Sequence, residues 1–254
     1  MNRRFDDLSC HETLDKLQIR IRAHRQFADF DVSDWIAEFV GRKPRNGILD
    51  LGCGDGNHLG IYLKHAGATG RVVGLDREAS LIDEARQRFD APNLDLRVAS
   101  MDDPLPFADA SFDLCLSNFA IYNAKEPRFT ILELKRVLRP GGEIVLIGST
   151  GNNARELFEF HRRLTGEPAD ELIIARSDRI RREIAPILAE VFGTACEEIL
   201  NSRLRFPNPA EFVAYYQATL FHEPTQAADR QRMLALVPPE LTVSKEMVAA
   251  TAIR

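Results

Sequence analysis

Short apolar runs alternate with amphipathic stretches through the middle of the chain. Five runs have the length of buried strands: 47–51, 71–75, 94–98, 112–117 and 143–149. Helical patterns separate them, over 57–66, 78–89 and 125–138. In the second of these, Leu81, Ile82, Ala85 and Phe89 recur at helical spacing. Strands that alternate with helices of this length predict an α/β fold, a mostly parallel sheet with helices on both faces.

The two flanks of this alternating region are mainly helical. Before it, Leu14, Leu17, Ile21 and Phe27 predict one helix, and Ser33 is placed to cap a second. After it come helical patterns over 153–164, 177–192, 208–221 and 225–237, a strand-like stretch over 195–206 and a closing strand. We therefore expect a single domain in four parts: a helical cap (1–46), a core (47–150), a helical insert on the substrate side (151–240) and the closing strand (241–254).

The first apolar run ends in an acid and leads into a glycine-rich loop. Asp50 is followed by Gly52, Gly54 and Gly56, and then by a helix. Glycine allows a sharp turn and close approach of a ligand to the main chain, and the free N–H groups of a helix N-terminus attract acceptors. Because ligands bind at the carboxyl ends of parallel strands, the pattern predicts a nucleotide-type cofactor site.

Two cofactor classes compete for this loop. A dinucleotide fingerprint would place its third glycine at position 57, where the chain has Asn57. An acid such as Asp50 would repel a pyrophosphate but attract an ammonium or sulfonium group. This favours S-adenosylmethionine over NAD. Asp76, at the end of the next strand, can bind ribose hydroxyls or cap the following helix, and Cys53 is interpreted as a small residue in a tight turn.

Four ordered stretches carry a resemblance to a known family. They are ILDLGCGDGNHL, VVGLDRE, DDPLPFADASFDLCLSNFAIYN and LKRVLRPGGEIVLIG, which together cover roughly residues 47–148. Their order and spacing resemble those of class I S-adenosylmethionine-dependent methyltransferases. The similarity is greatest to the small-molecule branch that includes the ubiquinone and menaquinone biosynthesis methyltransferases. The resemblance implies a Rossmann-like sheet of seven strands, mostly parallel, whose last strand is antiparallel.

The same resemblance assigns cofactor residues by position. They are Asp50, Gly52, Cys53, Gly54, Gly56, Asp76, Arg77, Met101, Asp102 and Asn118. The glycine loop would line the methionine part, Asp76 would hold the ribose and Arg77 would flank the adenine. Met101 would pack on the adenine ring, and Asp102 would bind the adenine amino group or serve as an ordinary solvated loop acid. Whether Asp102 or Asp103 contacts the adenine stays open.

Methyl transfer depends mainly on alignment of the methyl donor with the acceptor and on exclusion of water. A base is needed only where the acceptor must lose a proton. Tyr122 and Asn123 are the polar groups expected nearest the methyl group, and we take them as the candidate catalytic residues. The alternative for Tyr122 is a core residue with a satisfied hydroxyl, and His58 is interpreted as a helix-surface residue. Candidate substrate residues in the insert, each with structural packing as its alternative, are His161, Tyr215, Tyr216 and His222.

The charge of the chain limits the classes of acceptor molecule that we expect. The formal net charge is −5, whereas a nucleic-acid binder usually has a basic excess. We therefore expect a small-molecule acceptor and no DNA; the charge also disfavours RNA without excluding every RNA substrate. A dense basic stretch holds Arg176, Arg179, Arg181 and Arg182, as a solvated helix face or as a clamp for an anionic substrate. The four scattered cysteines predict neither a zinc site nor a disulfide framework, and no metal is expected.

No apolar run reaches the length of a membrane span, and the N-terminus lacks the apolar stretch of a signal peptide, so we expect a cytoplasmic protein. Three alternative functions stay open at this point. They are an NAD(P)-dependent oxidoreductase, a non-catalytic sensor or scaffold that binds S-adenosylmethionine, and an RNA methyltransferase. The acceptor atom (O, N or C), the pathway and the oligomeric state, a homodimer included, are also open.

Overall fold

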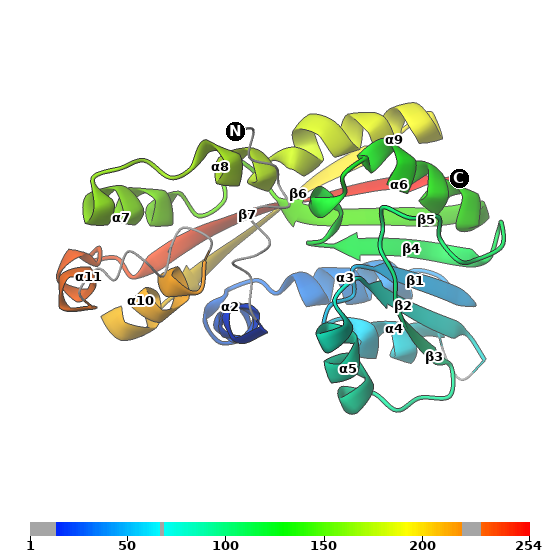
Figure 1. Ribbon diagram of the computed structural model, residues 1–254, viewed down its shortest axis with the longest axis horizontal. Coiled ribbons are helices and arrows are strands. Elements are labelled where there is room, and N and C mark those ends of the chain that lie inside the picture. The colour runs from blue at the N-terminus through cyan, green and yellow to red at the C-terminus, as the bar shows by residue number, and fades with distance from the viewer. Residues whose placement is uncertain (1–13, 67–68, 220–229) are drawn as a thin grey trace. The chain divides into compact units, whose positions relative to one another are not determined.

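The computed structural model describes residues 14–66, 69–219 and 230–254 (Figure 1). The chain divides into two compact units. The large unit comprises residues 32–148, 179–199 and 248–254, and the small unit comprises the described residues of 1–31, 149–178 and 200–247. The boundaries of the four expected parts differ from these, since residues 32–46 and 179–199 group with the core. The single-domain organisation stays a prediction.

Seven strands form one sheet in the order β3-β2-β1-β4-β5-β7-β6. Their bounds are β1 Gly47–Leu51, β2 Arg71–Asp76, β3 Leu94–Val98, β4 Phe112–Asn118, β5 Leu138–Ser149, β6 Cys196–Arg205 and β7 Thr242–Ile253. Strands β1 to β5 pair in parallel. The chain goes from β1 outward to β3 and then returns to place β4 on the other side of β1, so the topological switch point lies between β1 and β4.

The closing strand runs antiparallel to β5. The N–H of Arg254 donates to the carbonyl of Gly142 at 2.9 Å, and the N–H of Thr150 donates to that of Glu246 at 3.1 Å. The start of β5 therefore lies beside the end of β7, which makes the two strands antiparallel. The predicted fold, a mostly parallel Rossmann-like sheet with an antiparallel end, is confirmed.

The predicted helices occur in the expected order, and one helix, α8, was not predicted. The helices are α2 Leu14–Phe27, α3 Val32–Gly41, α4 Leu59–Ala66, α5 Ala79–Arg88, α6 Pro127–Val137, α7 Arg155–Thr165, α8 Glu171–Ser177, α9 Ala185–Phe192, α10 Pro209–Gln217 and α11 Arg230–Leu236. A 3₁₀ turn, η1, covers Ile121–Asn123, and a π-helical turn, η2, covers Ile180–Ile184. Among the described residues, none of the helices is both long enough and apolar enough to span a membrane.

Three local predictions need correction. Helix α3 begins at Val32, so Ser33 lies inside its first turn and is not its cap. The expected helix over 177–192 contains the π-helical turn η2, which directly precedes the turn of Pro186, a residue with no N–H to donate to the carbonyl four positions back. Strand β5 begins at Leu138 rather than at residue 143, because its first half includes Pro140 and two glycines that interrupt the apolar pattern.

Candidate active site

The glycine loop joins β1 to α4 at the carboxyl edge of the sheet. Gly52, Gly54 and Gly56 all have positive φ, at 81°, 56° and 85°, a conformation that other residues adopt at a cost. A Cβ atom on Gly52 would lie 2.2 Å from the Cβ of Ala120, in the loop after β4. Gly52 therefore allows the loops after β1 and β4 to approach each other closely.

The loop is fixed by the end of β2. The N–H groups of Gly52 and Cys53 both donate to the carbonyl of Leu75, at 2.7 and 2.9 Å. The side chain of Cys53 lies against β2, where the absence of a Cβ atom on Gly74 leaves room for its sulfur. Burial raises the pKa of the Cys53 thiol well above its ordinary value, which does not suit a nucleophile.

Asp50 is a buried acid with an unusual environment. It is 2% exposed, and no hydrogen bond from a described residue stabilises its charged form. Burial, and after it the negative charge of Asp76, raises the pKa of Asp50 to about 8. A buried carboxylate without a partner is costly to ionise, and a cationic group placed beside it would remove that cost.

Asp76 ends β2 and holds the loop from the other side. One of its carboxylate oxygens accepts from the N–H of Gly54 at 2.9 Å, and the other accepts from the N–H of Glu78 at 3.0 Å. Burial raises its pKa, and these two N–H donors oppose the rise. Asp76 does not cap α5, because the N-cap residue is Glu78 and no side chain caps this helix; its contact with the N–H of Glu78 belongs to the turn before the helix. Each of its oxygens also keeps a lone pair for a further donor such as a ribose hydroxyl.

Asn118 is the last residue of β4, the strand beside β1. It is 8% exposed, and its Nδ2 donates to the hydroxyl of Tyr62 on α4 at 2.6 Å. Its Oδ1 is buried and has no hydrogen-bond partner. Since Asp50 pairs in register with Leu116, Asp50 and Asn118 leave the sheet at the same edge. Two adjacent strand ends therefore present acceptors that lack donors.

A cavity opens at this edge within the large unit. The residues that line it are Leu51, Gly52, Asp76, Arg77, Ala99, Ser100, Met101, Asp102, Ala120 and Asn123. The structure thus brings together the residues predicted for the ribose and adenine, and it adds Asn123, which was predicted as a catalytic residue. Asp102 is half-buried and accepts a hydrogen bond from the N–H of Lys125 at 2.7 Å, so it also fixes the start of α6.

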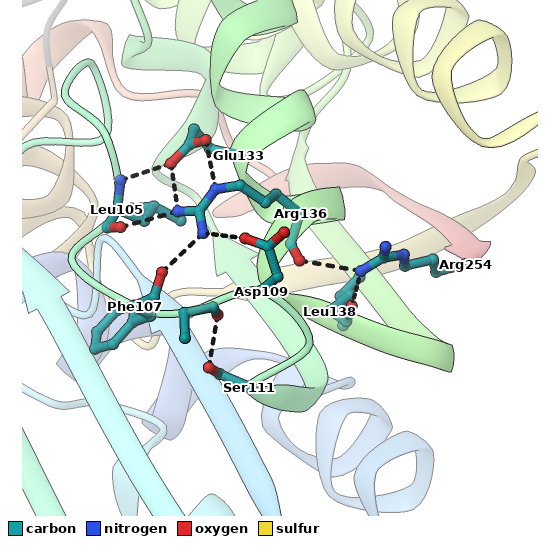
Figure 2. Close-up of polar contacts among 9 residues, drawn as sticks. Leu105, Phe107, Asp109, Ser111, Glu133, Arg136, Leu138 and Arg254 are labelled. Atoms are coloured by element: carbon teal, nitrogen blue, oxygen red, sulfur yellow. Dashed lines mark hydrogen bonds and ion pairs between the residues drawn. The ribbon is translucent and has the colours of Figure 1, made fainter.

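Helix α6 holds the loop that follows Met101 and Asp102. Figure 2 shows the guanidinium of Arg136 donating to the carbonyls of Leu105 and Phe107, at 3.0 and 2.8 Å, and pairing with Glu133. Glu133 also accepts from the N–H of Leu105 at 2.8 Å. This network was not predicted, because the charges on α6 resemble those of any solvated helix face.

The 3₁₀ turn after β4 holds Tyr122 and Asn123. The side chain of Tyr122 packs against the core of the large unit, close to Gly148. Arg179 fixes the backbone of this turn by hydrogen bonds. Its guanidinium donates to the carbonyls of Tyr122 and Ala124 at 2.8 and 2.6 Å, and the residue is 6% exposed. Arg179 is thus neither on a solvated face nor placed as a clamp, whereas Arg181 is exposed.

His58 was interpreted as a helix-surface residue, and this is wrong. It precedes the first residue of α4 and is 8% exposed. One ring nitrogen lies 3.3 Å from the amide nitrogen of Asn57. The ring is buried because it belongs to the turn that enters the helix, which packs against the sheet.

The small unit holds the described substrate candidates in its own core. His161 Nδ1 lies 2.7 Å from the hydroxyl of Tyr216, and burial raises the pKa of Tyr216 to about 12. The hydroxyl of Tyr215 lies 3.4 Å from Nε2 of His24. His222 lies outside the described residues. Among the described residues, no three His, Cys, Asp or Glu side chains gather as metal ligands would.

Comparison with known proteins agrees with this geometry. Residues 49–146 match the family model of the methyltransferase domain. The chain is 29% identical to the 2-phytyl-1,4-naphtoquinone methyltransferase of Trichormus variabilis, over 56% of this chain and 62% of the relative. It is 33% identical to the ubiquinone/menaquinone biosynthesis C-methyltransferase of Bdellovibrio bacteriovorus, over 44% of this chain and 48% of the relative. The match thus spans half to three fifths of these relatives.

A solved structure shows the same fold. The arsenic(III) S-adenosylmethionine methyltransferase of Chlamydomonas reinhardtii superposes with a TM-score of 0.53 at 18% identity, over 84% of this chain and 66% of that one. The cofactor of such domains fits the edge described above, since its ammonium and sulfonium charges suit Asp50 and its ribose suits Asp76. Residues 49–146 thus match a methyltransferase domain, and the comparisons support a class I S-adenosylmethionine-dependent methyltransferase of the small-molecule branch, whose cofactor is S-adenosylmethionine.

Proposed function

We propose that this protein transfers the methyl group of S-adenosylmethionine to a small-molecule acceptor. The observation that carries the proposal is the position of the buried acid Asp50 and the buried, unpartnered Oδ1 of Asn118 at neighbouring strand ends, at the switch point of the sheet. A ligand that brings an ammonium group satisfies both, and a dinucleotide would bring phosphates that Asp50 repels. Of the rival functions, the oxidoreductase is thus the least compatible with this edge.

The chain's own residues would hold and orient the donor. Asp50 and the glycine loop would bind its amino-acid end, Asp76 its ribose hydroxyls, and Arg77, Met101 and Asp102 its adenine. When bound, the cofactor supplies an electrophilic methyl group on a positively charged sulfur. The acceptor atom forms a bond to that methyl carbon while the carbon–sulfur bond breaks and its electron pair stays on sulfur. The protein contributes alignment and exclusion of water.

The roles of Tyr122 and Asn123 belong to the proposal. Asn123 lines the cavity, and the buried guanidinium of Arg179 fixes the backbone on both sides of it. Asn123 would contact the donor or the acceptor directly. Tyr122 packs against the core, which supports the structural alternative for this residue.

The acceptor class is part of the proposal as well. The named relatives act on quinones, which supports a small organic acceptor over DNA or RNA. We propose His161, Tyr215 and Tyr216 as structural residues of the small unit, because each already has a polar partner there. A cytoplasmic location and a homodimer remain proposals, to be tested by cell fractionation and by light scattering of the purified protein.

Isothermal calorimetry with S-adenosylmethionine, S-adenosylhomocysteine and NAD tests the cofactor. We expect micromolar binding of the first two and none of NAD, and the reverse result would overturn the proposal. Incubation with methyl-labelled cofactor and a metabolite extract then tests turnover. Transfer of label to a small molecule supports the enzyme, whereas tight binding without any labelled product would favour the sensor. Label on added RNA would favour the RNA methyltransferase.

A further inference from the structure

A tyrosine on α4, the helix that follows the glycine loop, contacts the last residue of β4. Tyr62, on α4, is fully buried, and its hydroxyl accepts a hydrogen bond of 2.6 Å from Nδ2 of Asn118. Tyr62 was not singled out from the sequence, because at its position a helix that covers the sheet presents an apolar side chain. A phenol that serves packing alone could be replaced by phenylalanine without loss, but this hydroxyl has a defined polar partner.

That partner is the amide whose other end is unsatisfied. With Nδ2 engaged by Tyr62, the free acceptor of Asn118 is Oδ1, which is buried and without a hydrogen bond. A rotated amide would turn an N–H group toward the site instead, where it would repel a cationic ligand. The direction of this amide therefore decides whether the end of β4 attracts or repels an ammonium group.

The surroundings of Tyr62 favour the observed direction. A tyrosine hydroxyl can donate or accept, so the contact with Asn118 does not choose the amide orientation by itself. The charge of Asp50 acts on this hydroxyl: together with burial, the larger cause, it raises the pKa of Tyr62 well above its ordinary value. In the structure Nδ2 of Asn118 is the donor and the Tyr62 hydroxyl oxygen is the acceptor, which leaves Oδ1 as the end of the amide without a partner.

We propose that Tyr62 is a positioning residue that holds the Asn118 amide with its oxygen toward the amino-acid end of the cofactor. This inference rests on the proposed function, since it presumes that the cofactor's ammonium group lies beside Asp50. Tyr62 would itself touch no part of the cofactor. It would set the affinity for the amino-acid end and leave the affinity for the adenosine end unchanged.

Two ligands separate these ends. S-adenosylhomocysteine has the amino-acid group, and 5′-methylthioadenosine lacks it. For Tyr62→Phe we expect calorimetry to show about tenfold weaker binding of S-adenosylhomocysteine and unchanged binding of methylthioadenosine. A general distortion of the site would weaken both ligands equally, and that result, or no change in either, would overturn the inference. Tyr216→Phe, the same deletion of a buried hydroxyl in the small unit, is the matched control and should change neither affinity.

Two further variants keep the test decisive. Asn118→Ala should show the same selective loss, and adding Tyr62→Phe to it should cause no further loss, because the hydroxyl acts through the amide. Additive losses would contradict the inference. Should Tyr62→Phe fail to fold, Tyr62→Met fills the space without a hydroxyl and permits the same comparison. If the wild type bound neither ligand, the proposed function would fall first, and that outcome is distinct from an unchanged ratio in the variant.

Discussion

The carboxyl edge of the large unit and the aromatic core of the small unit both hold buried polar side chains, and the two regions treat them differently. In the large unit, Asp50 is buried with no hydrogen bond that lowers its pKa, and Oδ1 of Asn118 is buried without a partner. In the small unit, His161 and Tyr216 are similarly buried but lie 2.7 Å from each other. Because native structures satisfy nearly all buried polar groups, the first region needs a ligand to be complete and the second does not.

The packing of side chains around these polar groups also differs between the two units. In the small unit, the rings of Phe160, Phe212 and Tyr216 meet edge to face, at centroid distances of 5.1 and 4.8 Å from Phe160. In the large unit, three glycines with positive φ follow the end of β1, and a Cβ atom on Gly54 would meet nothing within 4 Å. The small-unit core is therefore filled by its own side chains, whereas the loop after β1 is open at Gly54.

Removal of the Asp50 charge should have the largest effect on binding. For Asp50→Asn we expect S-adenosylhomocysteine to bind about a hundredfold more weakly in calorimetry, since a charge-assisted contact is lost in a buried place. The matched control is Asp113→Asn, an acid at the opposite end of the parallel strands, whose carboxylate accepts from the N–H groups of Asn46 and Gly47. The control should lose stability and keep its affinity; equal affinities in the two variants would contradict the account.

The same Asp50→Asn variant should be more stable without ligand. The folded pKa of Asp50, about 8, lies above its ordinary value of 3.8, so its contribution to stability is fully present below pH 3.8 and is lost as the pH rises through 8. Without an ionisable group at this position the loss disappears. Thermal melts of the ligand-free proteins at pH 6 and pH 9 should show the variant gaining on the wild type at the higher pH. A constant difference would argue against a strained carboxylate.

Gly52→Ala should damage the fold of the site. The added Cβ would lie 2.2 Å from that of Ala120, and φ at position 52 is 81°, so two penalties combine. We expect a loss of about 1–3 kcal/mol in the free energy of unfolding, measured in urea, together with weaker cofactor binding. Gly54→Ala, where a Cβ would meet nothing within 4 Å, carries the strain alone and should cost less.

Arg179→Met should separate turnover from cofactor binding. It removes the donors to the carbonyls of Tyr122 and Ala124 and frees the turn that holds Asn123. We expect kcat to fall about tenfold while the affinity for S-adenosylhomocysteine changes by less than about threefold, because the groups that hold the cofactor's amino-acid end are untouched. Arg181→Met, at an exposed position, serves as control. A change in KM for Arg181→Met alone would support the hypothesis that the basic stretch binds an anionic substrate.

Tyr216→Phe should have the smallest effect. The hydrogen bond to His161 is lost inside a packed core, so the free energy of unfolding should fall by about 1 kcal/mol while cofactor affinity stays the same. Chemical denaturation and calorimetry check the two halves of this prediction. A loss of cofactor affinity equal to that of Asp50→Asn would remove the distinction between the two regions.

The strands and the cofactor loop could be predicted from the sequence because both depend on the pattern of residues close together in the chain. The apolar runs, the glycines and the acids Asp50 and Asp76 lie within a few residues of the elements that they define. The partners of Arg179 and the Tyr62–Asn118 contact escaped prediction because they join residues more than 50 positions apart. His58 was misplaced for a related reason, since its burial depends on how the turn before α4 packs. The π-helical turn before Pro186 likewise has no sign in the apolar pattern.

The pKa of Asp50 gives the most direct test of the central claim, that a buried carboxylate at the end of β1 awaits a cationic ligand. Carboxyl-carbon NMR of labelled aspartate, assigned with Asp50→Asn, can follow its titration with and without S-adenosylhomocysteine. We predict a pKa of about 8 in the free protein and a value well below the ordinary one for aspartate in the complex, where the ammonium group stabilises the charge. An Asp50 titration that is the same in both states would contradict the account.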